Sequence, residues 1–194
     1  MAEFVSLACC ADSNFTDKKT TIIWKPDDSW FPDRTGCRNE SKPVVNTEAY
    51  NKSRLFNIDS GKRCYNLTTI ENEDYLVRGT FLFGDELSTT LDTSFNVLVG
   101  ASTISLVMSS SKDMEVEGIF RATENHIDFC LQKIKGDPYI SKVELRPLKN
   151  SEYLPGLSSP SLLKLVRRVD LGGTVDIRYA STFFASQIIK KMDH

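Results

Sequence analysis

The chain has 194 residues, a formal net charge of −2 and a hydrophobic fraction of 40%. This length suits one domain with a core, and the charge argues against a nucleic-acid or membrane-surface protein, because such proteins carry clustered basic residues. No apolar run approaches the roughly 18 residues of a membrane helix, and the N-terminus lacks the basic start, apolar middle and cleavage site of a secretory signal.

The first seventy residues are irregular. Residues 4–7 are expected to form a strand that enters a sheet, and residues 11–60 are rich in turn signals such as Pro26-Asp27-Asp28. Four Asn-x-Ser/Thr sequons make N-glycosylation candidates of Asn14, Asn39, Asn51 and Asn66. So many sequons in one third of the chain favour a domain from the secretory pathway, although Ser/Thr-rich loops would also produce them.

From residue 75 onward the sequence predicts β-strands. The expected strands are residues 75–83, 94–100, 103–108, 114–120, 126–132 and 139–145. They are rich in β-formers or alternate apolar and polar residues with a period of two. Their recurrence at intervals of about ten to twenty residues, with Gly, Asn, Asp or Ser between them, favours an antiparallel sandwich over βαβ units.

Two of these strands have a clear face pattern. In the third expected strand, Ile104, Leu106 and Met108 alternate with their neighbours and are assigned to one face. In the fourth, Glu115 and Glu117 lie two positions apart and are expected to form a solvated face.

The end of the chain breaks this pattern. Residues 149–160 read as a linker, because Pro155, Gly156 and a Ser-Ser-Pro cluster interrupt the alternation. Apolar character resumes at Leu162.

Catalytic chemistry has few residues to draw on. The two histidines are His126 and His194, and no Gly-rich phosphate loop occurs. A hydrolase triad or a His-based metal site is therefore not expected, and we predict no catalytic residue, metal or cofactor.

Sugar binding by stacked aromatic rings is a more specific hypothesis, with Trp24, Trp30 and Tyr139 as weak ligand-binding candidates. The alternative for each ring is packing in the core.

Several phrases of the sequence occur in the order found in a known family. They are Phe4-Val5-Ser6-Leu7-Ala8-Cys9, Gly61-Lys62-Arg63-Cys64-Tyr65-Asn66-Leu67, Tyr75-Leu76-Val77-Arg78 and residues 130–148. Together they resemble the first malectin-like lobe of plant leucine-rich-repeat receptor-like kinases, over residues 4–179. Trp30-Phe31-Pro32-Asp33 and Ala8-Cys9-Cys10-Ala11-Asp12 are similar to the symbiosis-receptor subfamily in particular.

The resemblance implies a fold and a domain organisation. It predicts an all-β, antiparallel jelly-roll-like sandwich at residues 3–148 and a connector towards a second lobe at residues 149–179. Residues 180–194 depart from the family, which continues with that second lobe, and form an atypical tail. We therefore expect a fragment or a truncated product of a longer gene.

The resemblance also implies a function. It predicts a non-catalytic ligand- or partner-binding ectodomain, acting in recognition and receptor regulation on the extracellular face of the plant plasma membrane, in root symbiosis signalling. Its partner would be a co-receptor or receptor ectodomain, or a cell-wall glycan. The alternative is a lectin-like domain that binds one cell-wall oligosaccharide.

The five cysteines are Cys9, Cys10, Cys37, Cys64 and Cys130. An odd number leaves one thiol unpaired or bonded outside the chain. In the family most lobes have counterparts of Cys9, Cys64 and Cys130, whereas Cys10 and Cys37 look like additions of the symbiosis-receptor subfamily. Two residues gained together imply a bond between them, which would contribute on the order of 3 kcal/mol. Other pairings among the five remain open.

Overall fold

The structure is a computed structural model that describes residues 4–18, 20–39, 50–83, 92–108, 113–148, 154, 162–169 and 186–191. These residues form fifteen β-strands and no helix, so the all-β prediction is confirmed. The strands are β1 (Val5–Ala8), β2 (Phe15–Thr16), β3 (Ile23–Pro26), β4 (Cys37–Asn39), β5 (Lys52–Leu55), β6 (Lys62–Thr68), β7 (Asp74–Phe81), β8 (Ser94–Val99), β9 (Ser102–Met108), β10 (Met114–Arg121), β11 (His126–Lys135), β12 (Tyr139–Ile140), β13 (Lys142–Pro147), β14 (Leu162–Val169) and β15 (Ser186–Lys191).

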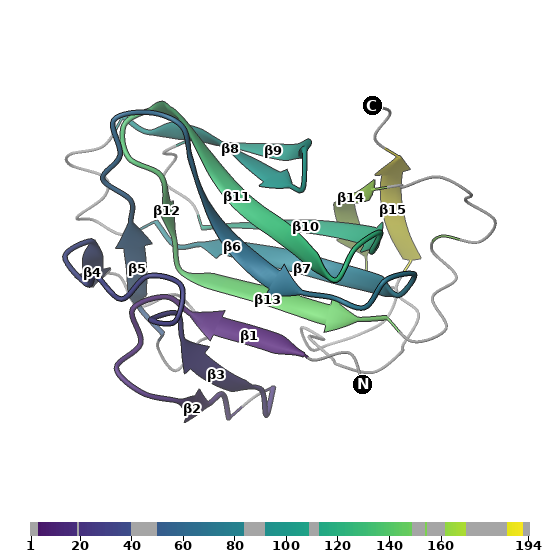
Figure 1. Cartoon of the computed structure of the whole chain (residues 1–194), viewed down its shortest axis with the longest axis horizontal. Coiled ribbons are helices and arrows are strands. Elements are labelled where there is room, and N and C mark those ends of the chain that lie inside the picture. Colours follow the sequence, from purple (N-terminus) through teal and green to yellow (C-terminus); the bar gives the residue numbers. More distant parts are fainter. Residues whose placement is uncertain are drawn as a thin grey trace.

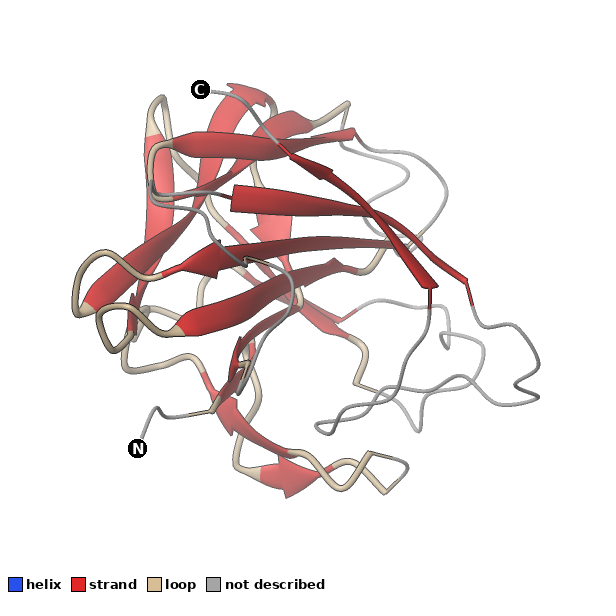
Figure 2. Ribbon diagram, turned by 90° about the vertical axis from the view of Figure 1, so that its right-hand side faces the viewer, coloured by secondary structure: helices blue, strands red, loops and turns tan. Residues whose placement is uncertain are grey.

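The larger sheet has eight strands in the order β15-β14-β10-β7-β13-β1-β3-β2. Every described segment in Figure 2 is a strand or a loop. Neighbouring strands are antiparallel except for β1 and β3, which run parallel. The N-terminal strand β1 therefore lies inside the sheet rather than at its edge. Strands β14 and β15 fall within the segments expected as connector and tail, and they extend the sheet beyond β10. The domain division after residue 148 stays a prediction.

A four-stranded sheet, β6-β11-β8-β9, packs on the larger one, and a small sheet, β12-β5-β4, lies beside them (Figure 1). The inward side chains of the two main sheets form a single core. Its largest fully buried members include Tyr65, Tyr75, Phe81, Phe95 and Phe129. Burial of this apolar area between facing sheets is the main stabilising term of the sandwich.

Gly79 lets the two main layers approach each other. It lies on β7 between Val77 and Phe81, which both belong to the core. A Cβ atom at this position would lie 2.6 Å from Cζ of Phe129 on β11. Only glycine therefore fits here without displacing the Phe129 ring.

The face pattern of β9 differs from the expected alternation. The register with β8 shifts beside Ile104, which is the extra residue of a β-bulge. Beyond the bulge Val107 packs in the core with Ile104, whereas Leu106 and Met108 are 47% and 58% exposed. The assignment of Ile104, Leu106 and Met108 to one face was wrong, because a bulge changes the face of every later residue.

The outer face of the larger sheet carries a buried row of charges. Arg78 of β7 lies opposite Glu117 of β10 and Glu144 of β13 in the strand register. It forms ion pairs with both, that with Glu144 at 3.2 Å, and Arg146 pairs with the other oxygen of Glu144. The expected solvated face was wrong for Glu117, which is 5% exposed, while Glu115 is exposed. Opposite charges on neighbouring strands make this burial tolerable.

Candidate functional site

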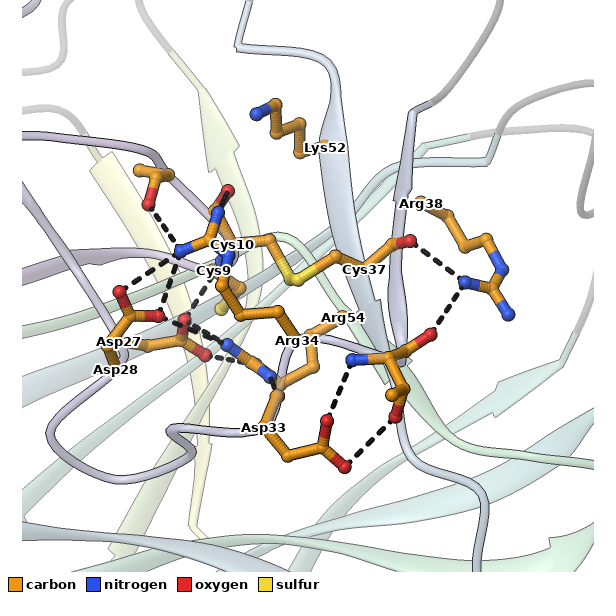
Figure 3. Close-up of a disulfide and its surroundings, with 12 residues drawn as sticks. Cys9, Cys10, Asp27, Asp28, Asp33, Arg34, Cys37, Arg38, Lys52 and Arg54 are labelled. Atoms are coloured by element: carbon orange, nitrogen blue, oxygen red, sulfur yellow. Dashed lines mark hydrogen bonds and ion pairs between the residues drawn. A yellow bond between two sulfur atoms is a disulfide. The ribbon is translucent and has the colours of Figure 1, made fainter.

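Two disulfides connect four of the five cysteines. Cys10, in the turn after β1, is bonded to Cys37 at the start of β4, and Figure 3 shows this bond with its surroundings. Cys64 and Cys130 face each other on β6 and β11 and form the second bond. Cys9 is free and buried. The first bond fastens the irregular residues between β3 and β4 to the larger sheet.

A buried carboxylate lies beneath the first disulfide. Asp27 is fully buried, and its two oxygens accept hydrogen bonds from Nε and Nη2 of Arg54 at 2.6 and 2.8 Å. They also accept bonds from the Tyr65 hydroxyl at 3.0 Å and from the backbone N–H of Cys10 at 2.9 Å. A carboxylate with this many donors and a paired guanidinium can stay charged in the interior. The arrangement joins β1, β5 and β6 to the turn that begins at Asp27.

The groups around Asp27 are held in their neutral forms. The Cys9 sulfur lies 3.3 Å from the Tyr65 hydroxyl oxygen. Burial, and next the charge of Asp27, raise the pKa of the Cys9 thiol well above its ordinary value. Burial likewise raises the pKa of Tyr65, and that of Tyr50, whose hydroxyl donates to the backbone oxygen of Cys9. A protonated, buried thiol is a poor nucleophile, so this cluster is unsuited to covalent catalysis.

An exposed layer of charges covers the buried network. Arg34 pairs with Asp12 at 2.9 Å and with Asp28 at 3.0 Å, and it donates to the backbone oxygen of Cys10 at 2.9 Å. Lys52 pairs with Asp12 at 2.6 Å and lowers the pKa of that carboxyl. The result is a polar surface whose backbone is held from below at Cys10 by a hydrogen bond to Asp27 (Figure 3). Sequence reasoning assigned Pro26-Asp27-Asp28 to a turn and did not identify this network.

The three aromatic candidates for sugar binding do not form one site. Trp24 is 2% exposed in a small separate core, with Nζ of Lys142 4.4 Å from its ring centroid. Tyr139 is also 2% exposed and belongs to the main core. Trp30 is half-buried, and its ring nitrogen donates to the backbone oxygen of Asn66 at 3.0 Å. Rings buried on both faces cannot stack on a pyranose, so Trp30 alone of the three keeps part of its surface available.

The sequon asparagines lie at the surface to different degrees. Asn14, Asn39 and Asn66 are exposed, and Asn51 is half-buried. The side-chain amide of Asn66 donates to Asp128 on the neighbouring strand at 2.9 Å. Glycosylation of these four residues stays a prediction.

One group of side chains has the composition of a metal site. The ligand atoms of Cys64, Asp128 and Cys130 lie within 4.8 Å of one another, and no second such group occurs in the described part of the chain. Both sulfurs are already bonded to each other, so neither can act as a thiolate ligand. Along the described ranges we also find no helix long and apolar enough to span a membrane.

Curated relatives of the chain are receptor kinases. Over 174 residues the chain is 46% identical to the nodulation receptor kinase of Pisum sativum, a match that covers 89% of the chain and 18% of that protein. Over 182 residues it is 34% identical to the probable LRR receptor-like serine/threonine-protein kinase At1g67720 of Arabidopsis thaliana, covering 89% and 19%. The chain thus spans about a fifth of the length of these relatives.

Solved structures share the fold. The extracellular domain of ANXUR2 from Arabidopsis thaliana superposes with a TM-score of 0.68 at 16% identity, over 88% of this chain and 50% of that one. A complex of the plant peptide RALF23 with FER and LLG2 gives a TM-score of 0.60 at 14% identity, over 86% and 48%. At these identities the similarity shows the sandwich alone. A sequence model of the malectin-like domain matches residues 7–184. The chain therefore belongs to the malectin-like domain family.

Proposed function

We propose that the chain is a non-catalytic, partner-binding ectodomain module of a plant receptor-like kinase, which acts in cell-surface recognition and receptor regulation during root symbiosis signalling. The observation that carries this proposal is the 46% identity to the nodulation receptor kinase of Pisum sativum over 174 residues. That identity extends across nearly the whole sandwich, and it is higher than the 34% found for At1g67720 of Arabidopsis thaliana.

The partner we propose is the ectodomain of a co-receptor or receptor. The polar surface above the Cys10–Cys37 bond supports this choice, because the exposed Arg34 is held there by an ion pair with the half-buried Asp28. Arg38, on the same segment, donates to the backbone oxygens of Thr35 and Cys37. A surface that is ordered before binding loses less conformational entropy in the complex. A solved neighbour, FER, was itself crystallised with a peptide and the protein LLG2.

A lectin-like function is the second candidate. It would use a cell-wall oligosaccharide as ligand and would place Trp30 against a sugar ring. The burial of Trp24 and Tyr139 weighs against it, because a sugar site needs several accessible rings or polar groups around one cleft.

A binding screen separates the two functions. The chain would be secreted with an added signal peptide, purified, and probed by biolayer interferometry with plant receptor ectodomains and with a panel of cell-wall oligosaccharides. We expect saturable binding to a protein ectodomain. Arg38→Glu should weaken it about tenfold, since reversing a charge in an interface costs more than 1 kcal/mol.

Arg63→Glu is the matched control, because Arg63 is also exposed but lies on β6, outside the segment between Cys10 and Cys37. It should leave the affinity within about twofold of the original. Saturable binding of one glycan class, lost in Trp30→Ala, would replace the proposal with the lectin-like function. Absence of binding to every ectodomain would count against the proposal itself.

A further inference from the structure

Among the described strands, β9 is an edge strand whose own residues lack the usual protection. It ends the four-stranded sheet and, among the described strands, it pairs with β8 alone (Figure 1). Its seven residues read STISLVM, with no charge and no proline. Edge strands normally carry charges or proline, or are very short, because their unpaired backbone groups attract other strands.

The other described edges do carry such protection. Strands β2 and β12 have two residues each. Strand β4 has three residues and includes Arg38. Strand β6 begins with Lys62 and Arg63, and β15 ends in Lys190 and Lys191. The neutral edge at β9 is therefore a local feature and not a property of the whole fold.

The outer face of β9 is suited to a neutral strand as its neighbour. Leu106 and Met108 point outward and are about half exposed. Next to Leu106 in the register lie Asn96 of β8 and then Gln132 of β11, whose side-chain amides are 3.4 Å apart. This row across three strands contains no charge. The bulge at Ile104 precedes residues 105–108, which pair regularly with β8, so this half of the edge is not twisted away.

We propose that β9 is a self-association edge, through which two copies of the chain pair antiparallel with Leu106 of one copy opposite Leu106 of the other. A strand that pairs with this edge must be extended, neutral and partly apolar. Strand β9 of a second copy has this composition. Antiparallel pairing of identical strands generates a twofold axis perpendicular to the sheet, so Leu106 and Met108 of both copies meet on one face. The two four-stranded sheets then become one continuous sheet. This interaction is additional to the proposed recognition of a receptor ectodomain.

The association is expected to be weak. A single short strand contact buries much less area than the roughly 1,600 Å² of a standard interface. We therefore expect a dissociation constant of about 10 µM to 1 mM. The small net charge of −2 adds little repulsion between copies at physiological salt.

Sedimentation velocity of the secreted chain tests the proposal. Between about 5 and 500 µM the weight-average mass should rise from that of a monomer towards that of a dimer. Leu106→Lys places like charges next to each other across the new strand pair and should raise the dissociation constant at least about tenfold. Met108→Lys should act in the same direction. Ile23→Lys is the matched control, since Ile23 is 59% exposed on β3, and it should leave the dissociation constant unchanged.

Hydrogen exchange of the backbone amides locates the contact. In the original chain the amides of residues 105–108 should exchange more slowly as concentration rises, and in Leu106→Lys they should not. A chain that stays monomeric over the whole concentration range would overturn the proposal. So would a dimer that forms equally well in Leu106→Lys and Met108→Lys.

Discussion

At the scale of single residues, the environment of Cys9 determines what its thiol can do. The only free thiol of the chain is buried next to the Tyr65 hydroxyl, and its pKa is raised well above the ordinary value by burial and by Asp27. Because its pKa is higher in the folded than in the unfolded chain, raising the pH favours the unfolded form. The stability due to the neutral thiol is complete below the unfolded value of about 8.5 and is lost as pH rises through the folded value.

We therefore predict that the free energy of unfolding is constant to about pH 8 and declines above it. Urea denaturation from pH 7 to pH 10 measures this, with Cys9→Ala as the variant that should lack the decline. Tyr50 and Tyr65 have pKa values raised by burial as well, so both proteins should lose stability above about pH 10. If the original chain and Cys9→Ala show the same dependence of stability on pH between about pH 8 and pH 10, Cys9 is not the titrating group.

At the scale of elements, the row formed by Glu117, Arg78 and Glu144 ties β10, β7 and β13 in register. Removing one partner of a buried ion pair leaves an uncompensated charge, which costs about 3–5 kcal/mol. We predict that Arg78→Met lowers the free energy of unfolding by about 3–5 kcal/mol, measured by urea denaturation. The double variant Arg78→Met with Glu117→Leu should recover most of it, because Glu144 keeps Arg146. A double variant no more stable than Arg78→Met would mean that Arg78 acts by packing alone.

The elements also show which features are readable from the sequence. Strands from residue 75 onward were predictable, since a period of two needs only neighbouring residues. The bulge at Ile104 was not, because a bulge depends on the pairing with β8 and not on β9 alone. The burial of Glu117 and Asp27 was missed for the same physical reason. Each carboxylate is buried only because a guanidinium, of Arg78 or Arg54, reaches it from another strand.

At the scale of the whole molecule, the larger sheet places the N-terminal strand in its interior, between strands from distant parts of the sequence. The N-terminal strand β1 pairs with β13 on one side and with β3 on the other. Its Leu7 is buried in the main core, and the next residue but one, Cys9, donates its backbone N–H to Ser141 at 2.9 Å. The sheet can therefore be completed only when segments far apart in the sequence are both present, which also makes such folds slow to form.

We predict that deletion of residues 1–8 prevents formation of the native sandwich, although the deleted chain keeps Cys10 and Cys37. The deletion opens two interior strand edges, on β13 and β3, and removes the burial of Leu7. Burial of one leucine contributes roughly 1.5–3 kcal/mol, and a domain of this kind is stable by only about 5–15 kcal/mol in total. Near-UV circular dichroism should show loss of fixed aromatic packing, whereas Phe4→Ala, at an exposed position just before β1, should retain it. Addition of a synthetic peptide of residues 1–8 should restore the signal, because the vacated position accepts an extended strand. A deletion variant that unfolds cooperatively with the original midpoint would instead mean that β13 and β3 close the sheet without β1.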